Sequence, residues 1–172
     1  MKKFGLAGWS GSGKTRLIMG LLPELIGRGY SVSTIKHAHH DFDIDKPGKD
    51  SFEHRRAGAS EVMISSEKRW ALMHEHRAAL EPNAEALIAE MTPVDLILIE
   101  GFKDDTHPKL EIHRDGNGKP LLYPNDPNIV AIATDKPLET NLPRLDIDDI
   151  LSIADFIESH CSLRRQALPG VA

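Results

Sequence analysis

GWSGSGKT, residues 8–15, is the stretch around which the chain is organised. It matches the phosphate-binding pattern G-x-x-x-x-G-K-[ST] at every fixed position and follows an apolar segment, residues 4–7, that is typical of a strand. Because Gly8, Gly11 and Gly13 lack a Cβ, the backbone can adopt positive φ and bring successive N–H groups close to phosphate oxygens. The alternative is a glycine-rich turn before an ordinary helix, but the complete match and the preceding strand favour a phosphate loop.

The side chains of this loop predict how a nucleoside triphosphate is held. A helix that starts near Gly13 directs its unpaired N–H groups and positive dipole end at the anion. Lys14 supplies a mobile charge for the β and γ phosphates, and Thr15 supplies a hydroxyl for a Mg²⁺ ion that bridges them. The predicted nucleotide contacts are Ser10, Gly11, Ser12, Gly13, Lys14, Thr15 and Arg16.

Length and composition limit the classes of protein to consider. The 172 residues suit a single α/β domain, which we assign to residues 1–161 with a loose C-terminal tail at residues 162–172. The net charge of −5 argues against a broad basic face for nucleic acid, and no apolar run approaches the ~18 residues of a membrane helix. The single cysteine, Cys161, cannot form an intramolecular disulfide. We expect a cytoplasmic protein with no nucleic-acid or membrane partner.

The segment after the loop predicts a helix and then a second strand. Residues 17–26 place apolar side chains at helical spacing, with Pro23 expected to kink the helix and Gly27 and Gly29 to end it. Residues 30–36 are rich in β-branched side chains and predict a strand parallel to the first. Further along, alternating side chains around a polar turn predict a β-hairpin with a helix on either side. The ranges are 52–58 for the first helix, capped by Asp50 or Ser51, 61–65 and 69–74 for the hairpin strands, and 81–91 for the second helix.

VDLILIEGF, residues 94–102, predicts a strand that is buried on both faces, as central parallel strands are. Its carboxyl end carries Glu100, and an acid in this position is typical of the second half of a phosphate-loop nucleotide site. A weak strand is predicted at 110–113, a buried strand at 128–133 and a helix at 147–159. Together these elements predict an α/β fold of the P-loop NTPase type, a mainly parallel sheet flanked by helices with an inserted β-hairpin.

Carboxylates near the loop are candidate metal ligands and catalytic groups. Glu100 is predicted to hold Mg²⁺ with Thr15, directly or through a water, although an acid at a strand end can instead cap a loop. Lys14, Glu100 and Asp50 are our candidate catalytic residues. Spacing alone does not separate Asp50 from its neighbours Asp41, Asp43 and Asp45 as a water-orienting group.

KHAHHDFDIDKPGKDS, residues 36–51, is a polar loop directly after a predicted strand, which favours a functional role. Its histidines, His37, His39 and His40, could form a transition-metal site. Contact with substrate or phosphate is favoured instead, because in an extended segment His40 faces away from the other two and no cysteine assists. Four basic residues could bind a phosphorylated ligand or partner: Lys46, Lys49, Arg55 and Arg56. For the two arginines, a solvated surface charge is the alternative.

Asp135 follows a predicted strand at the position where guanine-binding P-loop proteins carry [NT]-K-x-D. A carboxylate there accepts hydrogen bonds from the guanine N1–H and the exocyclic amine. The sequence departs from that pattern, because Lys136 follows the acid rather than preceding it by two residues. The alternative is that Asp135 shapes the turn before Pro137.

Five segments together resemble the MobB family of molybdopterin-guanine dinucleotide biosynthesis adaptor proteins: GWSGSGKT, IKHAHHDFDIDKPGKDS, RRAGA, RWALM and DLILIEGFK. The resemblance covers nearly all of residues 3–160. It implies a dimeric GTP-binding protein with weak GTPase activity that assists the guanylyltransferase MobA, which joins GMP to molybdopterin, and it makes molybdopterin a candidate ligand. It also implies that Lys14 and Thr15, with Gly11 and Gly13, hold phosphate and Mg²⁺, and that Glu100 completes the metal site.

Two other functions fit parts of the sequence. A small-molecule kinase would use the same phosphate loop but usually needs an arginine-bearing lid, and Arg144 is isolated while Arg164 and Arg165 lie in the predicted tail. A metal-delivery GTPase would use the histidine-rich loop. Metal analysis of the purified protein would separate that function from a GTP-binding adaptor.

Overall fold

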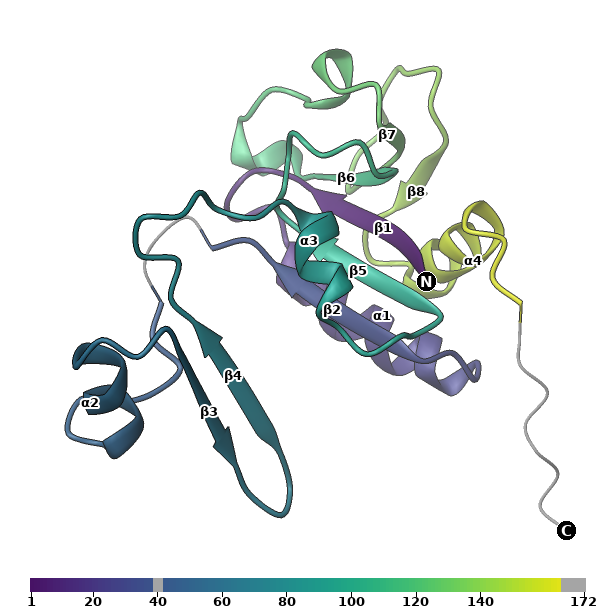
Figure 1. The fold of residues 1–172 in the computed structure, drawn as a ribbon. Helices are drawn as coiled ribbons and strands as arrows, with labels where there is room; N and C mark the ends of the chain where they lie inside the picture. Colours follow the sequence, from purple (N-terminus) through teal and green to yellow (C-terminus); the bar gives the residue numbers. More distant parts are fainter. Residues whose placement is uncertain (39–41, 165–172) are drawn as a thin grey trace, which may run out of the picture.

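The computed structural model describes residues 1–38 and 42–164 and contains a six-stranded parallel sheet of order β2-β5-β1-β6-β7-β8 (Figure 1). The strands are β1 (Lys2–Ala7), β2 (Val32–Lys36), β5 (Leu96–Glu100), β6 (Lys109–His113), β7 (Ile129–Thr134) and β8 (Arg144–Asp146). The helices α1 (Lys14–Gly27) and α4 (Ile150–His160) pack on one face, and the short α3 (Ala84–Ala89) packs on the other. The predicted fold class is confirmed.

Strand β5 explains why the apolar run in VDLILIEGF predicts a central strand. Side chains alternate between the two faces of a strand, so an element covered on both faces needs apolar residues throughout. Leu96 and Leu98 face the core under α1 and α4, while Ile97 and Ile99 face α3, and all four are fully buried. The strand therefore joins the two apolar layers of the molecule.

A second unit stands apart from this sheet (Figure 1). It comprises α2 (Asp50–Arg56) and the antiparallel hairpin of β3 (Glu61–Ser65) and β4 (Trp70–His74), which pair with Val62 opposite Met73. We call residues 50–74 the hairpin unit. The inserted β-hairpin is thus confirmed, and its two strands form a sheet of their own.

The predicted helix boundaries were wrong at several ends, because local caps decide them. The helix expected at 52–58 is α2, which begins at Asp50, where an acid favours the positive end of the helix dipole. The helix expected at 81–91 is the shorter α3, because the Asn83 side chain accepts a hydrogen bond from the Ala86 N–H and starts the helix there. The helix expected at 147–159 is α4, which begins after Asp149, whose carboxylate accepts from the Ser152 N–H.

The strand predictions also need correction. Residues 110–113 were predicted as a weak strand, but β6 lies at the centre of the sheet between β1 and β7. Its pattern is obscured because Lys109 and Glu111 are both buried at 1% exposure. The predicted strands at 30–36 and 128–133 are β2 and β7, each shifted in its bounds, and the edge strand β8 was not predicted.

Two further expectations concern α1 and the C-terminus. Helix α1 continues through Pro23 to Gly27. Of the predicted tail, residues 162–164 are described, and residues 165–172 lie outside the described part of the chain. None of the helices in the described ranges combines the length and the apolar character needed to cross a bilayer.

Candidate nucleotide-binding site

The phosphate loop connects the carboxyl end of β1 to the first turn of α1. Position 8 requires glycine because neighbouring atoms lie close to its backbone. A Cβ at this position would lie 2.6 Å from both the Ile112 carbonyl oxygen and the Ser12 Oγ. Gly13 has φ of 103° at the N-terminus of α1, a left-handed conformation that favours glycine. The loop therefore has the backbone of an anion cradle, as its glycine pattern predicts.

Two side chains of the loop face this cradle. The Lys14 Nζ donates hydrogen bonds to the carbonyl oxygens of Gly8 at 2.9 Å and Trp9 at 3.1 Å, which folds the ammonium back across the loop. Burial lowers the pKa of Lys14 from its ordinary value, and the negative charge of Glu100 opposes that shift. Ser12 is 2% exposed, and its buried Oγ has no hydrogen-bond partner among the described residues. The Oγ is packed against Gly8.

A pocket of about 640 Å³ opens in front of the loop, and it brings Lys14 and Glu100 together. Glu100 is 13% exposed, and its Oε2 lies 3.9 Å from the Nζ of Lys36. Lys103 also lines the pocket, with its Nζ 5.4 Å from the centre of the Trp9 ring. Glu100 is thus surrounded by cations, and among the described lining residues no other carboxylate is present.

These residues fit a magnesium-bound triphosphate. The backbone cradle and the Lys14 ammonium are groups that bind phosphate oxygens. Glu100 offers the hard carboxylate oxygen that Mg²⁺ prefers, and Thr15 is exposed in the first turn of α1, directly after Lys14. The residues present thus fit phosphates on the loop and a metal ion at Glu100, whereas Thr15 is not among the residues that line the same pocket.

The acids predicted from the polar loop lie elsewhere. Asp50 is the first residue of α2 in the hairpin unit, away from the phosphate loop (Figure 1), and it does not line the pocket. Asp43 and Asp45 accept hydrogen bonds from Arg55 at 2.6 and 2.8 Å. Asp41 lies outside the described residues. The geometry thus gives no support to the prediction that Asp50 is catalytic.

Arg55 joins the polar loop to the hairpin unit. In addition to its bonds to the two aspartates, its Nη1 lies 3.5 Å from Glu75, and hydrogen bonding to Asp45 raises its pKa above the ordinary value. This arginine is therefore neutralised by the protein itself rather than kept for a phosphorylated ligand. Three other basic residues predicted for that role have exposed side chains: Lys46, Lys49 and Arg56.

His37 is packed against the strand end that carries Glu100. Its ring stacks on Phe102 with 4.7 Å between centroids, and its Nε2 lies 2.8 Å from Glu81. A Cβ on Gly101 would lie 2.6 Å from the His37 Cβ. His39 and His40 lie outside the described residues, and within the ranges 1–38 and 42–164 no group of three or more His, Cys, Asp or Glu is arranged to hold a metal ion.

Asp135 is engaged in its own turn. Its Oδ1 accepts a hydrogen bond from the Asp115 N–H at 3.0 Å, and its Oδ2 lies 3.8 Å from Arg114. These contacts favour the interpretation of Asp135 as a residue that shapes the turn.

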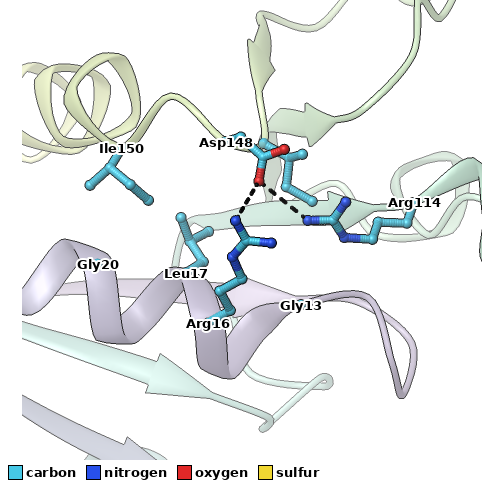
Figure 2. A pocket seen from close by; sticks show the side chains of 8 residues that line it. Gly13, Arg16, Leu17, Gly20, Arg114, Asp148 and Ile150 are labelled. Atoms are coloured by element: carbon cyan, nitrogen blue, oxygen red, sulfur yellow. Dashed lines mark ion pairs between the residues drawn. The ribbon is translucent and has the colours of Figure 1, made fainter.

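Sequence reasoning missed Arg114 and Asp148. Arg114 follows β6 and covers the start of α1, since a Cβ on Gly13 would lie 3.3 Å from its Nε. Its Nη2 lies 3.5 Å from Asp148, which also lies 3.4 Å from Arg16 (Figure 2). The rule that ligands bind at the carboxyl ends of parallel strands could have identified Arg114 had the segment at 110–113 not been considered a weak strand. Asp148 was not considered as a site residue because the sequence predicted a helix that begins at residue 147.

Comparisons with known proteins agree on one family. The sequence model of MobB, "Molybdopterin guanine dinucleotide synthesis protein B", matches residues 4–135. A protein of Escherichia coli (strain K12) described as a molybdopterin-guanine dinucleotide biosynthesis adapter protein is 45% identical over 154 residues, 88% of each chain. A protein of Haemophilus influenzae with the same description is 46% identical over 155 residues, 90% of this chain and 86% of its own. The crystal structure of Bacillus subtilis MobB has the same fold, with a TM-score of 0.71 at 23% identity over 96% of this chain and 100% of its own.

Proposed function

This chain belongs to the family of molybdopterin guanine dinucleotide synthesis protein B, and from that premise we propose that it binds GTP with Mg²⁺ as an adaptor in molybdopterin-guanine dinucleotide biosynthesis. The biosynthetic role follows from the descriptions of two relatives that match along most of their length. In this proposal the partner is a guanylyltransferase of the MobA kind, which joins GMP to molybdopterin, and the adaptor acts as a homodimer.

The observation that carries the nucleotide part of the proposal is the pocket shared by Lys14 and Glu100. The loop N–H groups and Lys14 would hold the phosphates, and Thr15 and Glu100 would hold Mg²⁺. A bound Mg²⁺ would neutralise part of the triphosphate charge. Lys36 and Lys103 add to the positive field that attracts the anion.

The same pocket supports weak rather than rapid hydrolysis. Rapid phosphoryl transfer to water requires a group that orients the attacking water in addition to the metal ligands. Among the described residues that line the pocket, Glu100 is the sole carboxylate, and we assign it to the metal ion. Asp50, the other candidate, lies on the hairpin unit. A pocket with this set of side chains fits an adaptor that binds nucleotide and hydrolyses it slowly.

Calorimetry with GTP and MgCl₂ on the parent and on Lys14→Ala tests the proposal. Loss of a charge-assisted contact to phosphate costs about 1.5–3 kcal/mol, so the affinity should fall roughly tenfold to a hundredfold. The matched control is Lys68→Ala, because Lys68 is an exposed lysine in the turn of the hairpin unit, and this change should leave the affinity as in the parent. Equal GTP affinity for the parent and Lys14→Ala would refute the assignment of the loop.

A further inference from the structure

A second pocket lies beside the phosphate loop, and none of the proposed phosphate or Mg²⁺ contacts uses its far end. It has a volume of about 150 Å³ and lies between α1 and the segment that joins β8 to α4 (Figure 2). Its lining combines three apolar with three charged side chains: Leu17, Ile147, Ile150, Arg16, Arg114 and Asp148. We infer that this pocket takes the base of the bound nucleotide and that Asp148 recognises guanine. The inference rests on the nucleotide binding proposed above.

The position of the pocket is right for a base. Gly13 belongs to the phosphate loop and also borders this pocket, so the pocket begins next to the loop. From Gly13 to Gly20 the pocket follows seven residues of α1, which is about 10 Å at 1.5 Å per residue. A nucleotide whose phosphates lie at the N-terminus of α1 can therefore place its base along this side of the helix. The pocket also lies at the carboxyl edge of the parallel sheet, where such folds bind ligands.

The walls of the pocket suit a flat aromatic ring. Leu17 and Ile147 are 2% and 4% exposed and contribute apolar surface from opposite sides. Gly20 lets Ile150 pack directly against α1, because a Cβ there would lie 2.9 Å from the Cδ1 of Ile150, and Ile150 thus adds apolar surface at this end of the pocket. Apolar walls with a few polar groups at the edge are typical of pockets for small aromatic ligands.

The charges at the rim match the two edges of guanine. Guanine has hydrogen-bond donors at N1 and at its 2-amino group, and acceptors at O6 and N7. Arg16 and Arg114 approach Asp148 Oδ1 at 3.4 and 3.5 Å, which is long for a charge-assisted hydrogen bond. The Asp148 carboxylate is 56% exposed and can accept from both donors, while Arg114 can donate to the acceptor edge. Adenine has no donor at N1 or C2 and would offer the carboxylate no hydrogen bond at that edge.

Asp148 can act in this way because its carboxylate is exposed and its ion pairs with Arg16 and Arg114 are long. Its backbone N–H donates to Asp146 Oδ1 at 2.9 Å, which fixes the turn independently of the side chain. By contrast, Asp135 already accepts a hydrogen bond from the Asp115 N–H. The structure therefore assigns guanine recognition to Asp148 rather than to Asp135.

Competition binding with GTP, inosine triphosphate, xanthosine triphosphate and ATP in MgCl₂ tests the inference on the parent and on Asp148→Asn. The variant should lose roughly tenfold to a hundredfold in GTP affinity, because a charged acceptor for two donors is removed. It should bind xanthosine triphosphate better than the parent does, since the asparagine amide can donate to the 2-carbonyl. Inosine triphosphate lacks the 2-amino group, so its deficit relative to GTP should shrink in the variant.

Two comparison variants separate the possible outcomes. Asp135→Asn should keep the parent's order of preference, and Glu139→Gln, at an exposed acid before β8, is the control for removal of a carboxylate. An unchanged order of preference in Asp148→Asn, or the same switch produced by Asp135→Asn, would overturn the inference. If every triphosphate depends on Lys14 while Asp148→Asn changes nothing, only the base assignment is lost. If Lys14→Ala has no effect, the nucleotide-binding proposal is refuted with it.

Discussion

The parallel sheet and the hairpin unit are held together by different forces. In the sheet, β5 buries four consecutive apolar side chains against two layers of helices. In the hairpin unit, Val62 and Met73 are each 8% exposed, whereas Met63 and Trp70 are more than 60% exposed. Packing therefore stabilises the sheet, whereas the hairpin unit has little apolar core of its own.

Ion pairs of Arg55 stabilise the hairpin unit, which has little apolar packing. Arg55 binds Asp43 and Asp45 and approaches Glu75, so one guanidinium connects segments before and after the unit. From this difference we expect that a substitution at a buried residue of the sheet destabilises the whole molecule. A substitution in the hairpin unit should affect only the stability of that unit.

The largest expected effect is on stability and compares the two regions directly. Leu98→Ala removes a fully buried side chain and should lower the free energy of unfolding by about 2–5 kcal/mol. Met63→Ala, at a residue that is 63% exposed, should change it by no more than about 0.5 kcal/mol. Urea unfolding measures both. Equal losses would mean that the hairpin unit is packed as tightly as the sheet.

A smaller effect separates function at the sheet edge from stability. Glu100→Gln keeps the shape of the strand end but removes the charge proposed to hold Mg²⁺, so Mg²⁺-dependent GTP hydrolysis should fall by roughly 10–100-fold while nucleotide still binds. Glu67→Gln, in the exposed turn of the hairpin unit, is the matched control. If Glu100→Gln hydrolyses GTP at the rate of the parent, Glu100 has a purely structural role.

The third expected effect is local and concerns Arg55. Arg55→Ala leaves Asp43 and Asp45 without their guanidinium, so amide hydrogen exchange should accelerate within the hairpin unit while β1 and β5 keep the protection of the parent. Arg69→Ala, at an exposed arginine of the same unit, should change neither region. Faster exchange throughout the sheet would show that the two regions unfold together.

Local patterns in the sequence predicted the elements that local chemistry determines. The phosphate loop follows from its fixed positions, β5 from an apolar run, and the hairpin from alternation around a polar turn. Helix ends were predicted less well, because single caps such as Asn83 decide them. The predicted phosphate loop and Glu100 share one pocket, as a nucleotide site requires.

Long-range partners explain most of what the sequence did not predict. Buried Lys109 is paired with Asp126 at 2.8 Å, and buried Glu111 accepts hydrogen bonds from the N–H groups of Leu122 and Tyr123. No local pattern identifies such partners, so β6 resembled a weak strand. Asp50 does not line the pocket for a related reason, since its nearness in sequence to the acids of the polar loop says nothing about where it lies in the fold.

The contact between His37 and Glu81 has a consequence for how this fold can diversify. The chain leaves the sheet at His37 and approaches it again at Glu81, and these two side chains touch at 2.8 Å. An insertion whose two ends emerge side by side interrupts the host fold at a single point, and such sites tolerate exchange of whole segments. The hairpin unit is thus an insertion that can be lengthened, shortened or replaced during evolution to suit a new partner. The nucleotide-binding sheet would be unchanged by such an exchange.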